Sequence, residues 1–403
     1  MPHALSHLLH NMQLGVLRLL IRLLPGGRPP LLFSGPGSAL QMCETLAELG
    51  TQRLLVVTDA VLMRLGVVDP LLEALRSRGV HCTVYDGVEP DPTHAQVEAG
   101  IALALRAGSE AVLAVGGGSP IDAAKLIAAC VTNGVPPSAL VGNFKVKRDP
   151  LPIYAIPTTA GTGAEVTVAA VLTDTAARAK AAVVDGKLVP RMAALDGSLM
   201  LGLPRHVTAA SGMDALTHAV ESYVSQFADA VTMPQSVTAV KLVFRHLPRV
   251  CADGTDLQSR QSMALAATCA GMAFSRASVG YVHAIAHNLG GLYHTPHGLA
   301  NAIVLPHILD FYQQAAAPRL AALATAIGAV PPGASEAEAV AAFIGQVREL
   351  SRAIGIPERL DTLREADIPE LARRAMAEAQ GFYPVPRFMR HAECEGILRK
   401  LLP

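Results

Sequence analysis

Histidines are concentrated in one stretch of the chain, Gly280 to Gly298, which reads GYVHAIAHNLGGLYHTPHG. His283 and His287 are four residues apart, so on a helix their side chains project from one face about one turn apart. A Gly-Gly pair at positions 290–291 is expected to interrupt this helix, and His297 follows where a loop or a helix start is expected. Imidazole nitrogens are good ligands for zinc, iron, copper and nickel, so the stretch predicts a metal site.

A second candidate pair lies upstream, in the segment Ser211 to Ser225, SGMDALTHAVESYVS. Asp214 and His218 are also four residues apart, on a segment whose apolar residues suit a helix with one buried side. Either pair alone is better explained by a hydrogen-bonded core histidine, or by an Asp/His pair that only supports a helix, than by a metal site. The two segments together predict one carboxylate and three imidazoles around a metal, a set that suits a catalytic rather than a structural ion.

The composition excludes several classes of protein. The chain has 403 residues, enough for two or three domains, and its formal net charge is zero without a long basic run. Nucleic acid is therefore not expected as a partner. Six cysteines are scattered without a CxxC pair, which indicates reduced thiols and a cytoplasmic location.

The first thirty residues form a Leu-rich extension. Arginines fall inside the apolar run and no small-residue cleavage site follows, so a signal peptide is not expected. The run is also too short for a membrane span. We expect an amphipathic helix over residues 3–24 that packs on the protein body, serves an oligomer contact, or makes weak contact with a membrane surface.

From residue 31 to residue 204, short apolar runs alternate with helical stretches. Strands are predicted at 53–59, 80–85, 111–115 and 151–156, with helices at 71–77 and 94–107. Continuous apolar strands of this kind are typical of a parallel sheet that is covered on both faces. From residue 205 to residue 403 the strands give way to Ala- and Leu-rich helices, including 258–273, 315–327, 337–354 and 369–379, so an α/β domain is followed by an all-α domain.

Two loops follow predicted strands of the α/β half. The first, GGGSPIDAAK, spans residues 116–125; its glycines allow close approach to a ligand, and Ser119 and Pro120 suit Ncap and N1 of a helix beginning at Ile121. Such a helix start favours a pyrophosphate, although a plain tight turn is an equal alternative and the spacing is not G-x-G-x-x-G. The second loop, PTTAGTG, adds threonine hydroxyls. Asp59 ends the first strand, where it could bind a ribose or simply cap a helix.

These motifs resemble those of the iron-containing (group III) alcohol dehydrogenases, relatives of glycerol dehydrogenase and dehydroquinate synthase. The resemblance runs from about residue 32 to near the C-terminus. It rests on GGGSPIDAAK, PTTAGTGAEVT, the stretch 212–223 and HAIAHNLGGLYHTPHGLANAIVLPH, in this order. It implies a dehydroquinate synthase-like fold, with an α/β dinucleotide-binding domain before an all-α metal and substrate domain.

The resemblance also assigns roles to individual residues. It implies that the metal ligands are Asp214, His218, His283 and His297, and that His287 is not a ligand but a catalytic group near the nicotinamide. The implied cofactor residues are Asp59, which is associated with NAD rather than NADP, together with Gly117, Gly118, Ser119, Thr158, Thr159, Thr162 and Lys180. In one departure from the family, the turn that often reads P-N-P-T has Asp91 in place of asparagine.

The function expected from this resemblance is the reversible, metal-dependent oxidation of a small or medium primary alcohol to an aldehyde, with hydride transfer to NAD. The expected metal is Fe²⁺, with Zn²⁺ as the alternative because zinc binds such donors more tightly. A glycerol or diol dehydrogenase, a hydroxyacid-oxoacid transhydrogenase and a lyase of the same fold are alternatives. A homodimer or larger oligomer is implied as well.

Overall fold

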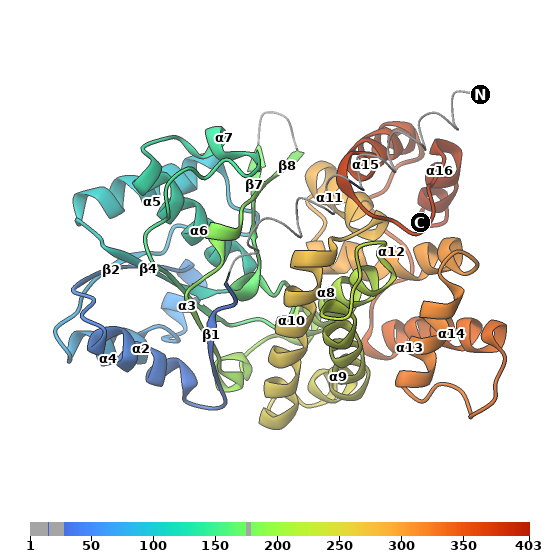
Figure 1. Ribbon diagram of the computed structural model, residues 1–403, viewed down its shortest axis with the longest axis horizontal. Coiled ribbons are helices and arrows are strands. Elements are labelled where there is room, and N and C mark those ends of the chain that lie inside the picture. Colours follow the sequence, from blue (N-terminus) through green and yellow to red (C-terminus); the bar gives the residue numbers. More distant parts are fainter. Residues whose placement is uncertain (1–14, 16–27, 175–178) are drawn as a thin grey trace. The chain divides into compact units, whose positions relative to one another are not determined.

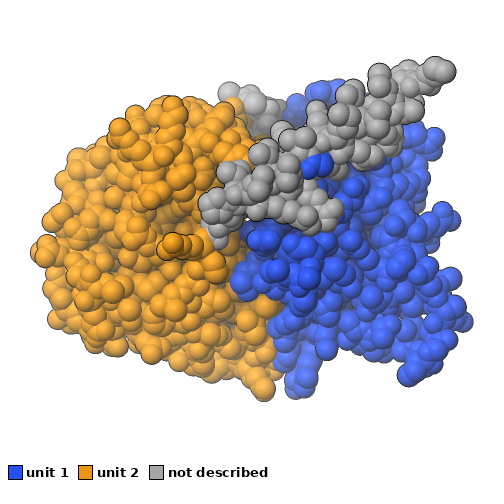
Figure 2. All heavy atoms as spheres, in the orientation of Figure 1, with its two compact units in different colours: residues 1–26, 205–252, 272–403 blue, residues 27–204, 253–271 orange. Residues whose placement is uncertain are grey.

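The computed structural model describes residues 15, 28–174 and 179–403. The predicted N-terminal helix of residues 3–24, with its membrane or oligomer contact, lies outside the described residues apart from residue 15. Among the described helices, none has both the length and the apolar character that a membrane span requires. The chain forms two compact units (Figure 2): unit 1 takes the described residues of 1–26, 205–252 and 272–403, and unit 2 takes those of 27–204 and 253–271.

Unit 2 is built on a six-stranded parallel sheet in the order β1-β9-β6-β4-β2-β3. The strands are β1 Leu31–Ser34, β2 Arg53–Val57, β3 His81–Tyr85, β4 Ala111–Gly116, β6 Ile153–Pro157 and β9 Met192–Leu195. The predicted parallel sheet is therefore confirmed, and so are the four strands expected within it. β1 and β9 are additions that the sequence pattern did not indicate.

Helices cover both faces of this sheet (Figure 1). They are α2 Ser38–Glu48, α3 Ala60–Arg64, α4 Asp69–Arg76, α5 His94–Arg106, α6 Gly118–Asn133 and α7 Pro137–Leu140. Leu54 and Val56 of β2 belong to the core with α2 and α4, whereas Leu55 and Val57 belong to the core with α5 and α6. Because successive strand residues point to opposite faces, a strand buried on both sides must be apolar throughout, which explains the continuous apolar runs.

A second sheet of three strands, in the order β5-β8-β7, was not predicted. Its strands are β5 Gly142–Asn143, β7 Ala169–Asp174 and β8 Ala179–Val184, and β7 pairs with β8 in antiparallel register. Short 3-10 helices at Ala164–Val166, Gly186–Leu188 and Gly197–Met200 complete the connections. This small sheet matters for the site because β8 carries Lys180.

Unit 1 is helical in its described residues, as predicted for the second half of the chain. Its helices are α8 Arg205–Val224, α9 Thr232–Ala252, α11 Tyr281–Tyr293, α12 His297–Tyr312, α13 Ala317–Ala326, α14 Glu336–Ile354, α15 Ile368–Phe382 and α16 His391–Arg399, with a 3-10 turn at Glu365–Asp367. α10, Leu257–Ala277, contributes residues to both units. The units therefore do not follow the chain order, because residues 253–271 belong to unit 2.

The glycine pair at 290–291 does not interrupt its helix, contrary to the prediction. α11 continues to Tyr293 and ends where His294 adopts a left-handed conformation, with its N–H donating to the carbonyl of Gly290 at 2.9 Å. Both glycines are buried. A glycine costs a helix about 1 kcal/mol relative to alanine, which tertiary packing of an apolar helix easily outweighs.

The start of α6 also differs from the prediction. The helix begins at Gly118 with Gly117 as its N-cap, not at Ile121 with Ser119 as the cap. The N–H of Ile121 already donates to the carbonyl of Gly117, at 3.4 Å. Pro120 therefore lies in the first turn, where its missing N–H costs nothing because the first N–H groups of a helix have no partner within it.

Close packing of α12 on α8 yields a prediction. A Cβ at Gly298 would lie 2.3 Å from the carbonyl oxygen of Ala210, so Gly298→Ala must push the helices apart beside His297. We expect a loss of about 1–3 kcal/mol of stability. The control is Gly345→Ala in α14, where a Cβ meets nothing within 4 Å, and which should add about 0.5–1 kcal/mol. Thermal midpoints of both variants test this, and a Gly298→Ala protein that melts with or above the wild type would contradict it.

Candidate functional site

Two of the predicted ligands come from α8, a helix that is buried along its second half. Asp214 and His218 lie one turn apart on one face and are 2% and 5% exposed. A charged carboxylate is rarely buried this deeply without partners. Its nearest ionisable neighbours are the three predicted histidines. The burial of these groups together indicates that the cluster has a functional role.

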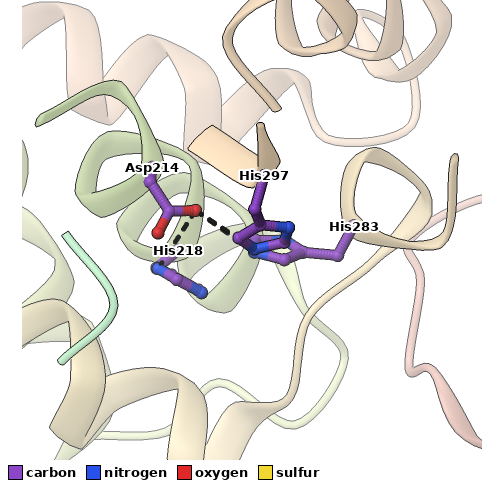
Figure 3. Close-up of side chains that lie close together, drawn as sticks. All are labelled: Asp214, His218, His283 and His297. Carbon is purple, nitrogen blue, oxygen red and sulfur yellow. Dashed lines mark ion pairs between the residues drawn. The ribbon is translucent and has the colours of Figure 1, made fainter. Parts of the chain in front are cut away.

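The other two predicted ligands come from α11 and α12, and Figure 3 shows all four side chains converging. Asp214 Oδ1 lies 3.9 Å from His218 Nδ1, 3.8 Å from His283 Nε2 and 3.5 Å from His297 Nε2. One ligand atom from each residue can be chosen so that all four lie within 4.8 Å of one another. Ligand bonds of about 2.0–2.2 Å would bring one ion within reach of all four atoms after small side-chain movements.

The ring of His218 is held in place by two neighbouring rings. It lies between Phe274, at 4.2 Å between centroids, and His283, at 4.4 Å. Burial lowers the pKa of His218 to about 4, so the ring is neutral near pH 7, and neutral imidazole is the form that binds metal. Its Nδ1 is buried and has no hydrogen-bond partner among the described residues. An orphaned buried nitrogen facing a carboxylate fits a bound cation.

The amide of Asn301 lies among the ligand groups and was missed by the sequence reasoning. Its Nδ2 donates to Asp214 Oδ1 at 2.7 Å and lies 3.2 Å from Nε2 of both His283 and His297. Its Oδ1 is buried without a partner among the described residues. The signal was present in the sequence, because Asn301 follows His297 by four residues and so shares its helix face.

A second carboxylate, Glu221, was missed as well. It is 3% exposed, and its Oε2 lies 2.6 Å from His283 Nδ1, on the opposite side of the ring from Asp214. Burial raises the pKa of Glu221 to about 7. It follows Asp214 and His218 at helical spacing on α8, a pattern that the sequence already contained.

His287 lies beside the four-residue cluster and is not part of it. Its ring stacks on that of His297 at 5.2 Å between centroids, and its Nδ1 lies 2.7 Å from Glu378 Oε1. Glu378 also accepts hydrogen bonds from the Tyr383 hydroxyl at 2.8 Å and from Asn288 at 3.2 Å. Sequence spacing could not reveal Glu378, because it lies 91 residues from His287 and the contact depends on α15 packing against α11.

The structure brings the two predicted cofactor loops of unit 2 together. A Cβ at Gly117 would lie 3.2 Å from Thr159 Oγ1, and one at Gly118 would lie 2.7 Å from Thr162 Cγ2. The glycines therefore allow the threonine loop to approach the start of α6. Thr158 is buried, and its N–H donates to the carbonyl of Gly116 at 2.9 Å.

Lys180 and Ser119 are linked through Asp91. Lys180 Nζ lies 2.6 Å from Asp91 Oδ1, and the N–H of Asp91 donates to Ser119 Oγ at 3.2 Å. Asp91 has a positive φ of 61°, which aspartate tolerates better than most residues. The two predicted cofactor residues thus belong to one polar network.

Asp59 caps α3. Its Oδ1 accepts hydrogen bonds from the N–H groups of Val61 and Leu62, each at 2.9 Å, which is the alternative that the sequence left open. β2, β4 and β6 are neighbours in the sheet, so Asp59 and the glycine and threonine loops follow their carboxyl ends at one edge. In open α/β sheets, ligands bind at this edge.

The position of Asn301 yields a prediction. Asn301→Asp places a second carboxylate against Asp214, and with a chelator present the repulsion should lower the thermal midpoint by about 4–8 °C. Added Zn²⁺ should raise the midpoint more than in the wild type. The control is Asn288→Asp, which faces Glu378 outside the four-residue cluster and should gain no extra rise from Zn²⁺. An equal rise with Zn²⁺ in Asn301→Asp and wild type would argue against a metal beside Asn301.

Two family models match the chain. The model described as "Iron-containing alcohol dehydrogenase" matches residues 29–197, and the model described as "Fe-containing alcohol dehydrogenase family, C-terminal" matches residues 208–402. Together these ranges cover most of the chain.

Similar proteins and solved structures agree with the family models. The 1,3-propanediol dehydrogenase of Klebsiella pneumoniae is 40% identical over 92% of this chain and 97% of that protein, and the lactaldehyde reductase of Escherichia coli (strain K12) is 37% identical over 85% and 90%. A crystal structure of 1,3-propanediol oxidoreductase matches with a TM-score of 0.89 and 39% identity, covering 93% of this chain and 98% of that one. Since family models match both halves of the chain and these relatives are 37% and 40% identical over most of it, the chain belongs to the iron-containing alcohol dehydrogenase family.

Proposed function

We propose that this protein reversibly oxidises a small primary alcohol to an aldehyde, using a divalent metal ion and NAD. The observation that carries the proposal is the buried cluster of Asp214, His218, His283 and His297. One carboxylate and three imidazoles are donors that suit ferrous iron or zinc. The function also agrees with the family to which the chain belongs.

The four residues of this cluster are proposed to hold the ion. When bound, the ion would supply Lewis-acid chemistry that lowers the pKa of the substrate hydroxyl. Asp214 contributes the negative charge that favours a cation, and its burial strengthens that attraction because the effective dielectric constant is lower there than in water. Phe274 covers one face of His218 and fixes the orientation of its ring.

His287 is proposed to orient the substrate or to carry its proton. Its Nδ1 faces Glu378, which favours the tautomer with a proton on Nδ1 and leaves the Nε2 lone pair as an acceptor. The side chain is 18% exposed, so it remains accessible. Stacking on His297 holds the ring beside the proposed metal ligands.

The described residues of 31–204 are proposed to form the dinucleotide-binding domain, and those of 205–403 the metal and substrate domain. Gly117, Gly118 and Ser119 would bind the pyrophosphate at the start of α6, where backbone N–H groups favour anions. Thr158, Thr159, Thr162 and Lys180 would complete the pocket, and Asp59 would bind the ribose. In support, a sulfoacetaldehyde reductase from Bifidobacterium kashiwanohense, solved in complex with NAD⁺, matches with a TM-score of 0.85 and 28% identity.

Small alcohols and diols are the substrates to screen first. Relatives of this chain include enzymes named 1,3-propanediol dehydrogenase and NAD-dependent methanol dehydrogenase, the latter from Bacillus methanolicus. A rise in NADH absorbance with alcohol and added NAD supports a dehydrogenase. A transhydrogenase or lyase of the same fold would give no net NADH.

Two further properties are proposed. A homodimer or larger oligomer is supported by β1, an edge strand of the six-stranded sheet whose Leu31 is 60% exposed and Leu32 36% exposed. Unpaired edges with apolar side chains favour pairing with another chain.

A cytoplasmic location is supported by six cysteines that are all free thiols. Weak membrane-surface contact through residues 3–24 stays a prediction.

The metal proposal predicts that ligand loss removes metal and activity together. His283→Ala or His297→Ala should abolish bound metal and lower turnover by a factor of about 1,000 or more. The matched control is His206→Ala, an exposed histidine on α8. Elemental analysis after anaerobic purification should find about one iron or zinc per chain in the wild type and the control. Retained activity in a variant that lacks metal would refute the mechanism.

The cofactor proposal predicts a preference for NAD that depends on the charge of Asp59. Asparagine caps helices as well as aspartate does, so Asp59→Asn should keep α3 and remove only the charge. Affinity for NADP should rise about tenfold, which corresponds to about 1.4 kcal/mol, while that for NAD changes little. Calorimetric titration of both nucleotides measures these affinities. An unchanged affinity for NADP would show that Asp59 does not contact the nucleotide.

A further inference from the structure

Glu221 connects the two helices that supply three of the proposed metal ligands. It belongs to α8, as do Asp214 and His218, and its side chain is 2% exposed. Its carboxyl group makes three polar contacts with the start of α11. The N–H of Gly280 donates to Oε2 at 2.9 Å, the N–H of Val282 donates to Oε1 at 2.8 Å, and His283 Nδ1 lies 2.6 Å from Oε2.

These bonds replace a cap that α11 does not supply itself. Gly280 is the N-cap residue and has no side chain to bond the first N–H groups of the helix. Glu221 fulfils that task from another helix, because its two oxygens accept from N–H groups at the start of α11. A Cβ at Gly280 would lie 2.8 Å from Glu221 Oε1, so glycine is what lets the carboxylate approach.

We propose that Glu221 is a positioning residue that holds His283 with its proton on Nδ1, so that the Nε2 lone pair faces Asp214 and the ion. This inference rests on the proposed metal function. A carboxylate accepts hydrogen bonds, and its other two partners are backbone N–H groups that can only donate. His283 therefore presents Nδ1–H to Glu221 and leaves Nε2 unprotonated, 3.2 Å from Asn301 Nδ2 and 3.8 Å from Asp214 Oδ1.

Glutamine is the informative substitution because it has the size of glutamate but the wrong hydrogen-bonding pattern. In Glu221→Gln one oxygen becomes an NH₂ group. If that group faces Val282, two donors meet. If the NH₂ group takes the place of Oε2, it faces the N–H of Gly280, which is also a donor. It can then only donate to His283 Nδ1, so the ring proton must lie on Nε2, where it blocks the ligand bond. Both arrangements lose a hydrogen bond between α8 and α11, the helices that supply three of the proposed ligands.

The matched control is Tyr312→Phe. The Tyr312 hydroxyl is buried without a partner among the described residues, and it lines the same small cavity as Glu221 and Gly280. Removing it disturbs the neighbourhood of Glu221 but leaves the three hydrogen bonds of the carboxylate. Metal affinity should stay within about twofold of the wild type.

The experiment titrates Co²⁺ into wild type, Glu221→Gln, Tyr312→Phe and His297→Ala, and records both affinity and the visible absorption of the bound ion. Glu221→Gln should bind Co²⁺ about 10–100-fold more weakly, with an altered spectrum. If Glu221 only capped α11, the variant would melt at a lower temperature but bind Co²⁺ with wild-type affinity and spectrum, and that result overturns the inference. If the wild type binds no better than His297→Ala, the metal function itself fails, and the inference with it.

A measurement on the wild type covers the case in which Glu221→Gln does not fold. In the Zn²⁺-loaded protein, ¹⁵N NMR distinguishes a ring that is protonated on Nδ1 from one that is protonated on Nε2, and the loss of a signal in His283→Gln assigns it. A proton on Nδ1 of His283 supports the inference. A proton on Nε2 overturns it, whatever the variant does.

Discussion

The helical unit depends on keeping one carboxylate and three imidazoles together in a buried, apolar environment. Removing a charged carboxylate from water costs several kcal/mol unless it is paired. Asp214 recovers part of this cost through the amide of Asn301 and through three histidines within 4 Å of its Oδ1. A divalent cation would recover far more, because Coulomb attraction is strong where water is excluded.

Small residues make this cluster possible by letting the helices approach. A Cβ at Gly212 would lie 2.3 Å from Leu247 Cδ1, where α8 packs on α9. Gly298 allows α12 the same close approach to the backbone of α8 at Ala210. Since α8, α11 and α12 each supply a proposed ligand, the separation of these helices sets the distances among the four groups. The glycines are thus part of the site although none of them binds anything.

In the α/β unit, buried polar groups stabilise the elements that carry the two proposed cofactor loops. Lys125 is fully buried and donates hydrogen bonds to the carbonyl and hydroxyl oxygens of Thr167, both at 2.9 Å, and to the carbonyl of Ala169 at 2.8 Å. Asp122 Oδ2 accepts from the N–H of Val171 at 3.0 Å. These bonds tie α6 to β7, whose partner strand carries Lys180. The Asp and Lys of GGGSPIDAAK therefore hold the hairpin, while the glycines shape the loop.

The sequence by itself determined the parallel sheet, the helical second half and the Asp214–His218 pair on α8, because each depends on local periodicity. A strand buried on both faces has to be apolar throughout, and side chains three or four residues apart share one helix face. Only the tertiary structure decided which groups surround the histidines. Glu378 reaches His287 across 91 residues, and Glu221 reaches His283 across 62. It also kept α11 helical through its buried glycine pair, against local propensity, because the packing energy of a buried helix exceeds the cost of two glycines.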